Sequence, residues 1–361
     1  MSSSLLAQNT IESTPMRKSS RCSGAVQAMA TCTGMELTGS PLPLNHQNAF
    51  PLIRMPRTQD GGGPVTDVDP VVQIGRLAMW DEGAEKLVQS NHPNIPQMLG
   101  DRDLDGKPDE GFRGMFGIMD VVEVHPPEGI FTVPPVDTPP KDKDKGDTIF
   151  YWMQLLNLGY RIPGVVNTDA HYNFHGSGWL RNYIASSTDE PSKISVSEMV
   201  KASEQGRIIM STAPFLQAEV RTGDAASMKR YISGDLVPLG KQPAKLWMRV
   251  QCANWYDINR VQVFVNGKAI PELNFTRKSH PDLFSNKTIR FEHTAALPEL
   301  TSDAHIIVAT IGEGLKLTEI MGPDRKDMPP TAVANPIYLD VDGNGFQPNR
   351  DNLGVPFMIK E

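Results

Sequence analysis

The residues of this chain best suited to chemistry are carboxylates and histidines at the ends of short apolar runs. Asp169 and His171 follow the apolar run from Ile162 to Val166, which is typical of a short buried strand. Side chains at the carboxyl ends of strands form the functional sites of many α/β proteins. A carboxylate oxygen and an imidazole nitrogen placed there could together bind a divalent metal ion. The alternative is an aspartate that caps a turn beside a histidine with a purely structural role.

The tripeptide Asp-Ala-His occurs a second time, from Asp303 to His305, and serves as an internal comparison. This copy precedes the apolar run from Ile306 to Ile311, so it lies where a strand begins. We therefore predict that His305 is structural and lies far from Asp169.

Three further residues share the strand-end context of Asp169. Glu36 lies in one short predicted strand, and His92 follows another. His46 lies in the segment 41–51, which we predict to be a loop because it has too many prolines for a helix interior. In a barrel of parallel strands, such strand ends converge. The set that would then suit Zn²⁺, Mn²⁺ or Fe²⁺ is Glu36, His46, His92, Asp169 and His171.

Two acidic loops suggest a different kind of metal site. Asp101, Asp103 and Asp105 have the alternate spacing that begins a calcium-binding loop. The position that holds glutamate in an EF-hand is Phe112 here, so only a smaller loop completed by Asp109 or Glu110 would bind calcium. The alternative is a solvated acidic turn. For the second loop, 340–346, we favour a turn whose side chains cap backbone amides over a calcium site.

Length and composition limit the class of protein. A chain of 361 residues predicts two domains, and a net charge of −7 argues against a nucleic-acid partner. No apolar run approaches the roughly 18 residues of a membrane helix. Residues 1–30 lack the apolar core of a secretory signal, and we predict a disordered tail there. The chain as it stands favours a cytoplasmic protein, whereas a start further upstream would allow export.

The remaining chain has two parts that differ in their predicted secondary structure. Over residues 31–215, short strands alternate with helices predicted at 70–85, 148–158 and 195–205, which indicates an α/β fold with a parallel sheet. Over residues 216–361, helical patterns nearly vanish. Short strands are predicted there at 246–251, 260–265, 288–292 and 306–311, with a hairpin signal at Asn266-Gly267. We expect this second part to be an all-β, sandwich-like domain.

Taken in order, several of these motifs resemble a known family. Gly34-Met-Glu36-Leu-Thr, His46, Asn91-His92-Pro93 and Thr168-Asp-Ala-His171 resemble successive motifs of the PHP (polymerase and histidinol phosphatase) superfamily. The closer similarity is to its carbamate-hydrolase-like branch, the CehA/McbA-type metallohydrolases, and it spans about residues 33–352. The resemblance implies a distorted β/α barrel that binds up to three metal ions. It also implies hydrolysis of a small-molecule phosphoester, carbamate or amide.

The resemblance also implies roles for individual residues. Glu36 would bridge metal ions and take part in catalysis, His46 and His92 would share one ion with it, and Asp169 and His171 would bind the other ions. Arg181 would hold an anionic group of the substrate, with a surface salt bridge as the alternative. His125 and His175 would be either additional site groups or hydrogen-bonded loop histidines.

The chain departs from the family pattern at its start. PHP proteins begin with a His-x-His motif and an Asp-His motif, but no histidine precedes Glu36 here. We therefore expect a partial, N-terminally truncated barrel and a hydrolase impaired by the missing ligands. The alternative is a non-catalytic remnant or binding protein whose β-domain contacts a carbohydrate or a protein partner.

Overall fold

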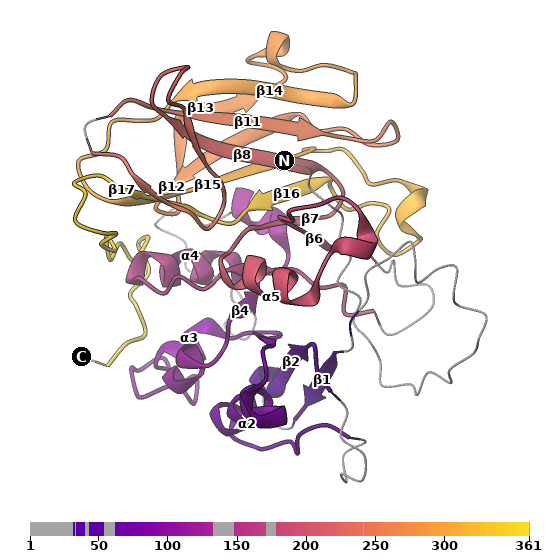
Figure 1. Ribbon diagram of the computed structural model, residues 1–361, viewed down its shortest axis with the longest axis vertical. Helices are drawn as coiled ribbons and strands as arrows, with labels where there is room; N and C mark the ends of the chain where they lie inside the picture. The colour runs from indigo at the N-terminus through magenta and orange to yellow at the C-terminus, as the bar shows by residue number, and fades with distance from the viewer. Residues whose placement is uncertain are drawn as a thin grey trace.

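The computed structural model describes residues 32, 34–39, 43–53, 62–132, 148–170, 178–240 and 242–360. The strands in these ranges form three sheets. In Figure 1 the four-stranded sheet lies at the top and the eight-stranded sheet below it. The helices α4 and α5 follow, and the five-stranded sheet lies at the bottom with α2 and α3. The predicted disordered tail, residues 1–30, lies outside the described residues.

The five-stranded sheet carries most of the candidate site. Its strands, in spatial order, are β1 (Met35–Thr38), β2 (His46–Phe50), β3 (Leu87–Ser90), β4 (Val121–Glu123) and β5 (Gly164–Val165). The pairs β1–β2 and β2–β3 are antiparallel, whereas β3–β4 and β4–β5 are parallel. The predicted parallel sheet is therefore wrong, because three of its five strands pair in antiparallel fashion. The segment 41–51, which was predicted to be a loop, contains the strand β2.

The predicted partial β/α barrel of PHP type is also wrong. The described strands form several sheets with few helices, and none of these sheets closes. At the outer edge of β5, Asn182 accepts a hydrogen bond from Val166 N (3.0 Å) and donates one to Val166 O (2.8 Å). Asn335 pairs in the same way with the N and O of Gly164, both at 2.8 Å. These two side chains satisfy the backbone groups that a further barrel strand would have paired.

The eight-stranded and four-stranded sheets enclose a second core. The eight-stranded sheet contains β6 (Arg181–Ile184), β7 (Ile208–Ser211), β10 (Leu236–Pro238), β12 (Arg260–Val265), β13 (Lys268–Thr276), β15 (Ala304–Ile311), β16 (Thr331–Ala334) and β17 (Ile337–Asp340). The four-stranded sheet contains β8 (Phe215–Thr222), β9 (Lys229–Tyr231), β11 (Ala244–Gln251) and β14 (Ile289–Ala296). Because β6 pairs with β7 and β7 pairs with β16, the predicted division at residue 215 runs through the larger sheet.

Several local predictions for this region are confirmed. The strands expected at 246–251, 260–265 and 306–311 fall within β11, β12 and β15, and the strand expected at 288–292 overlaps β14 from residue 289 onwards. Asn266 and Gly267 join β12 to β13 with φ of 51° and 78°, the left-handed pair that a type I′ hairpin turn requires.

The strand β15 is buried on both faces and separates two cores. Ile306 and Val308 pack towards the four-stranded sheet, whereas Ile307 and Ala309 pack towards α4. Because successive side chains of a strand point to opposite faces, β15 contributes residues to both apolar clusters. This explains why the sequence of β15 reads as a continuous apolar run.

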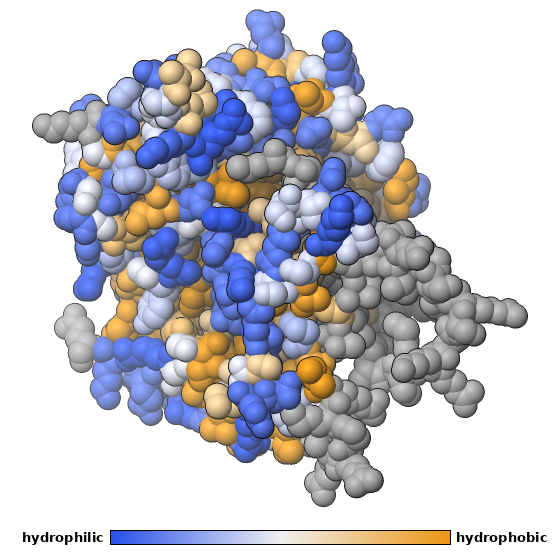
Figure 2. Space-filling view, viewed as in Figure 1, coloured by the Kyte–Doolittle hydropathy of each residue, from blue (hydrophilic) through white to orange (hydrophobic). Residues whose placement is uncertain are grey.

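The α-helices of the described ranges that cover the sheets are α2 (Pro70–Gly83), α3 (Ile95–Leu99), α4 (Thr148–Leu158) and α5 (Val196–Glu204). Ser195 Oγ caps the start of α5 by accepting a hydrogen bond from Glu198 N (3.1 Å), and Gly159 ends α4 at φ 98°. Figure 2 shows polar residues over α5, whose Met199 and Val200 face the interior. No helix in the described ranges is long and apolar enough to cross a membrane. The 3₁₀ helices are η1 (Pro43–Asn45), η2 (Arg113–Gly117), η3 (Pro127–Phe131), η4 (Pro191–Lys193), η5 (Pro281–Leu283) and η6 (Glu319–Met321).

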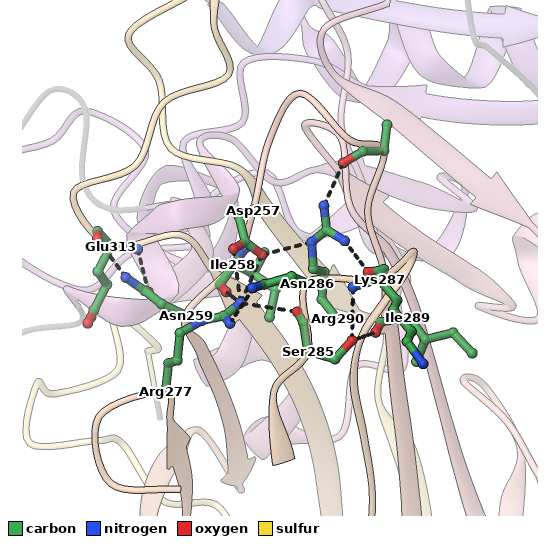
Figure 3. A network of polar contacts seen from close by, with 11 residues as sticks. Asp257, Ile258, Asn259, Arg277, Ser285, Asn286, Lys287, Ile289, Arg290 and Glu313 are labelled. Atoms are coloured by element: carbon green, nitrogen blue, oxygen red, sulfur yellow. Dashed lines mark hydrogen bonds and ion pairs between the residues drawn. The ribbon is translucent and has the colours of Figure 1, made fainter. Parts of the chain in front are cut away.

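A polar network ties together the loops at one end of the two larger sheets (Figure 3). Asp257 forms ion pairs with Arg290 (Nε–Oδ1, 3.0 Å) and Arg277 (Nη2–Oδ2, 2.9 Å). Arg290 is only 8% exposed, so its charge depends on Asp257 for compensation. We assign this network to stability, because Asp257 lies between two arginines and compensates the charge of the buried one.

Candidate metal site

Glu36, His46 and His92 come together at one edge of the five-stranded sheet. The antiparallel register of β1 and β2 pairs Thr38 with His46, which places His46 Nδ1 3.5 Å from Glu36 Oε1. The rings of His46 and His92 meet edge to face, with centroids 5.1 Å apart. One ligand atom from each of the three residues lies within 4.8 Å of the other two. The chain thus gathers two imidazoles and one carboxylate from β1, β2 and the end of β3.

Asp169 joins this group from the end of β5. Its Oδ2 lies 3.9 Å from His92 Nε2. His92 and Asp169 both adopt left-handed backbone conformations, with φ of 44° and 45°. Such conformations cost a non-glycine residue roughly 1–3 kcal/mol and are concentrated at functional sites. Each residue follows a parallel strand, so a sharp turn after the strand points its side chain towards the common site.

The geometry and chemistry of the group suit a transition metal. Donor atoms about 2.1 Å from a tetrahedral ion lie about 3.4 Å apart, close to the 3.5 Å and 3.9 Å separations seen here. Imidazole nitrogens with carboxylate oxygens favour zinc, manganese or iron. His46 is 31% exposed and Glu36 is 18% exposed, so solvent or a substrate can reach an ion held between them. These are the features of a site with an open coordination position.

Glu123, at the end of β4, belongs to the site but was not among the predicted ligands. It is 4% exposed, and its Oε2 accepts a hydrogen bond from His92 N (2.7 Å) and faces His92 Nδ1 at 3.5 Å. Asn167 donates to the other carboxylate oxygen (3.3 Å). Asn91 orients Glu36 in a similar way, through a 3.0 Å hydrogen bond to Oε1. Glu123 ends an apolar strand as His92 does, and this strand-end signal was available in the sequence.

A second group of polar residues lies beside Glu123. The imidazole of His125 meets the edge of the Trp179 ring at 6.1 Å between centroids, and the Arg325 guanidinium lies over that ring at 4.6 Å. His125 keeps contact with solvent, but the surrounding protein lowers its pKa. Burial also raises the pKa of Glu128, one turn further along the chain.

Arg181 lies at the start of β6 and does not form a surface salt bridge with any described residue. Its Nη2 donates weakly to Thr212 O (3.4 Å) and contacts Met321 Sδ (3.9 Å), while its buried Nε has no described partner. Its role towards a substrate stays a prediction. His171 and His175 lie outside the described residues.

The two acidic loops gather carboxylates without involving the main site. Asp101, Asp103 and Asp105 each place an oxygen within 4.8 Å of the others, and burial raises the pKa of Asp101. Asp109 does not join them, because it accepts hydrogen bonds from the backbone amides of Arg102 and Gly111. Calcium binding at the first loop stays a prediction.

In the second loop, Asp340 and Asp342 lie with Asp303. Asp303 accepts hydrogen bonds from Val341 N (2.8 Å) and Gln347 N (2.7 Å), as expected of a side chain that caps backbone amides. Nearby His305 lies buried in β15, where its Nε2 meets Asn157 Oδ1 at 2.9 Å. Burial lowers the pKa of His305 to about 3, so this histidine is neutral and structural.

Comparisons of the chain with protein-family models, with curated proteins and with solved structures return no match. The functional assignment therefore depends on the chemistry of the site itself.

Proposed function

We propose that this protein is a metal-dependent hydrolase in which Glu36, His46 and His92 hold a divalent transition-metal ion. The observation that carries the proposal is the approach of their three ligand atoms to within 4.8 Å of one another, on side chains that keep contact with solvent. Asp169, 3.9 Å from His92, offers a further oxygen ligand. The resemblance to PHP metallohydrolases supports the same ligands and favours a phosphoester, carbamate or amide as the substrate.

Glu36, His46 and His92 would hold a divalent ion, which would supply Lewis acidity and lower the pKa of water. The protein prepares for this through its own hydrogen bonds. Glu123 fixes the backbone of His92 and faces Nδ1 of its ring, which leaves Nε2 directed towards Asp169. Asn91 fixes the carboxylate of Glu36. Such outer partners hold metal ligands in their binding orientation.

Metal analysis of the purified chain tests the first part of this proposal. After dialysis against zinc, manganese or iron, we expect about one ion per chain at this site, because three protein ligands suffice for one open site. His92→Ala should lose the ion, while His280→Ala, a change at an exposed histidine of the loop after β13, should retain it. Equal metal content in both variants would contradict the site.

Turnover tests the second part. The metal-loaded chain should hydrolyse 4-nitrophenyl phosphate or a 4-nitrophenyl carbamate slowly, because the ligands of the His-x-His and Asp-His motifs are missing, and His92→Ala should abolish that activity. A chain that binds the ion at Glu36, His46 and His92 but turns over neither compound would instead be a metal-binding protein without catalysis.

A further inference from the structure

The guanidinium of Arg325 packs over an aromatic ring, and its buried Nε has no hydrogen-bond partner among the described residues. Arg325 lies in the loop that follows η6, and its Cζ lies 4.6 Å from the centroid of the Trp179 ring. Trp179 is 2% exposed, so the ring is a rigid support. Among the described residues no carboxylate lies within ion-pair distance of Arg325, and its buried Nε has no hydrogen-bond partner. Stacking uses the face of a guanidinium and leaves the N–H groups along its edge free.

Arg325 also lies close to the proposed metal site. Its support, Trp179, contacts the imidazole of His125, which follows Glu123 by two residues at the end of β4. Glu123 in turn faces His92 at 3.5 Å. Burial is the main cause of the lowered pKa of His125 and of the raised pKa of Glu128. The positive charge of Arg325 adds to the first shift and opposes the second, so its field reaches the residues beside Glu123. A series of direct neighbours thus joins His92 to Arg325.

A second arginine lies on the same side. Arg181 follows Trp179 by two residues in the chain, and its Nη2 contacts Met321 in η6, the 3₁₀ helix that precedes Arg325. The buried Nε of Arg181 also has no described partner. Glu128 is an acidic group that interacts electrostatically with Arg325, but its buried Oε2 makes no hydrogen bond with a described residue. The region beside the metal site therefore offers two guanidinium groups whose charges no described carboxylate pairs.

We propose that Arg325 binds an anionic group of the substrate, a carboxylate or a phosphate, while the bond to be cleaved lies at the Glu36–His46–His92 site. This inference rests on the proposed function and narrows it to negatively charged substrates. A guanidinium held flat against an aromatic ring presents two parallel N–H groups, the arrangement that binds carboxylate and phosphate bidentately. It also means that the loop between β15 and β16, far along the chain, completes a site built on the first sheet.

Anion binding gives a test that does not depend on turnover. The full chain, with and without manganese, is titrated calorimetrically with inorganic phosphate and, in a separate arm, with succinate. Arg325→Ala should weaken binding about 10- to 100-fold, as expected for loss of a charge-assisted pair, and Arg325→Lys should recover part of it. The matched control is Arg221→Ala, which removes an arginine that lies over Trp247 at 4.4 Å on another sheet and is paired with Glu219. This control should bind the anions as the wild type does.

Failure can be assigned to one proposal or the other. A wild type that binds neither anion, an Arg325→Ala variant that binds as tightly as the wild type, or equal weakening by Arg221→Ala would each overturn the role of Arg325. A wild type that does not bind manganese would instead refute the metal site. The titrations without manganese would still test the role of Arg325. The tighter of the two anions identifies whether a phosphate or a carboxylate is the natural group.

Discussion

Replacing Glu123 with glutamine separates metal binding from folding more sharply than any change to a ligand. The substitution keeps the shape of a side chain that is 4% exposed and leaves an oxygen to accept the 2.7 Å hydrogen bond from His92 N. It removes the negative charge that faces His92 Nδ1 at 3.5 Å. The imidazole of His92 then loses the group that fixes its ring orientation and raises its basicity.

The expected magnitude follows from this outer position. Loss of a partner that orients a metal-binding histidine weakens metal affinity about 10- to 100-fold, which corresponds to about 1.4–2.7 kcal/mol. The stability of the metal-free protein should change little or increase, because a buried carboxylate is costly to desolvate whereas the amide is neutral. The affinity is measured by competition with a chromophoric chelator, and the stability by urea unfolding of the metal-free chain.

The same strand provides the control. Asp120, just before β4, accepts a hydrogen bond from Val88 N at 2.7 Å, as Glu123 does from His92 N, but it lies at the other end of the strand. Asp120→Asn should therefore leave metal affinity unchanged. An affinity of Glu123→Gln within about twofold of the wild type would refute the reasoning, because a change of that size is far below the range for an orienting partner.

Three other predictions address stability and the acidic loop. Burial raises the pKa of Asp120 to about 6, so the wild type should lose stability relative to Asp120→Asn as the pH rises from 4 to above 6, as measured by urea midpoints. Asp257→Ala should lower the free energy of unfolding by roughly 3 kcal/mol, because it leaves the buried charge of Arg290 uncompensated. The control Asp327→Ala should lower it by less than about 1 kcal/mol, because it removes only an exposed ion pair. If the first acidic loop binds calcium, calorimetry should show a binding heat at millimolar calcium that Asp103→Ala abolishes, and a wild type without that heat would leave only an acidic turn.

Local structure could be predicted where neighbouring residues decide it. The helix α4 begins and ends at the predicted residues, and α5 (Val196–Glu204) lies within the helix predicted at 195–205. The hairpin turn at Asn266-Gly267 forms because only such residues accept two successive left-handed conformations at low cost. The sequence also indicated that Glu36, His46 and His92 would lie together, because each was predicted at a short apolar strand or on the loop that follows one.

Strand pairing and the outer parts of the site required the tertiary structure. A short apolar strand carries no information about the direction of its partner, so the antiparallel β2 and the open edge of β5 were missed. That edge is closed by the side-chain amides of Asn182 and Asn335. These amides pair with backbone groups 16 and 171 residues away in the sequence. Likewise, Arg325 reaches Trp179 only because the loop after β15 folds back beside β6. Local residue patterns select helices, strands and turns, whereas contacts between distant residues depend on packing that only the folded chain provides.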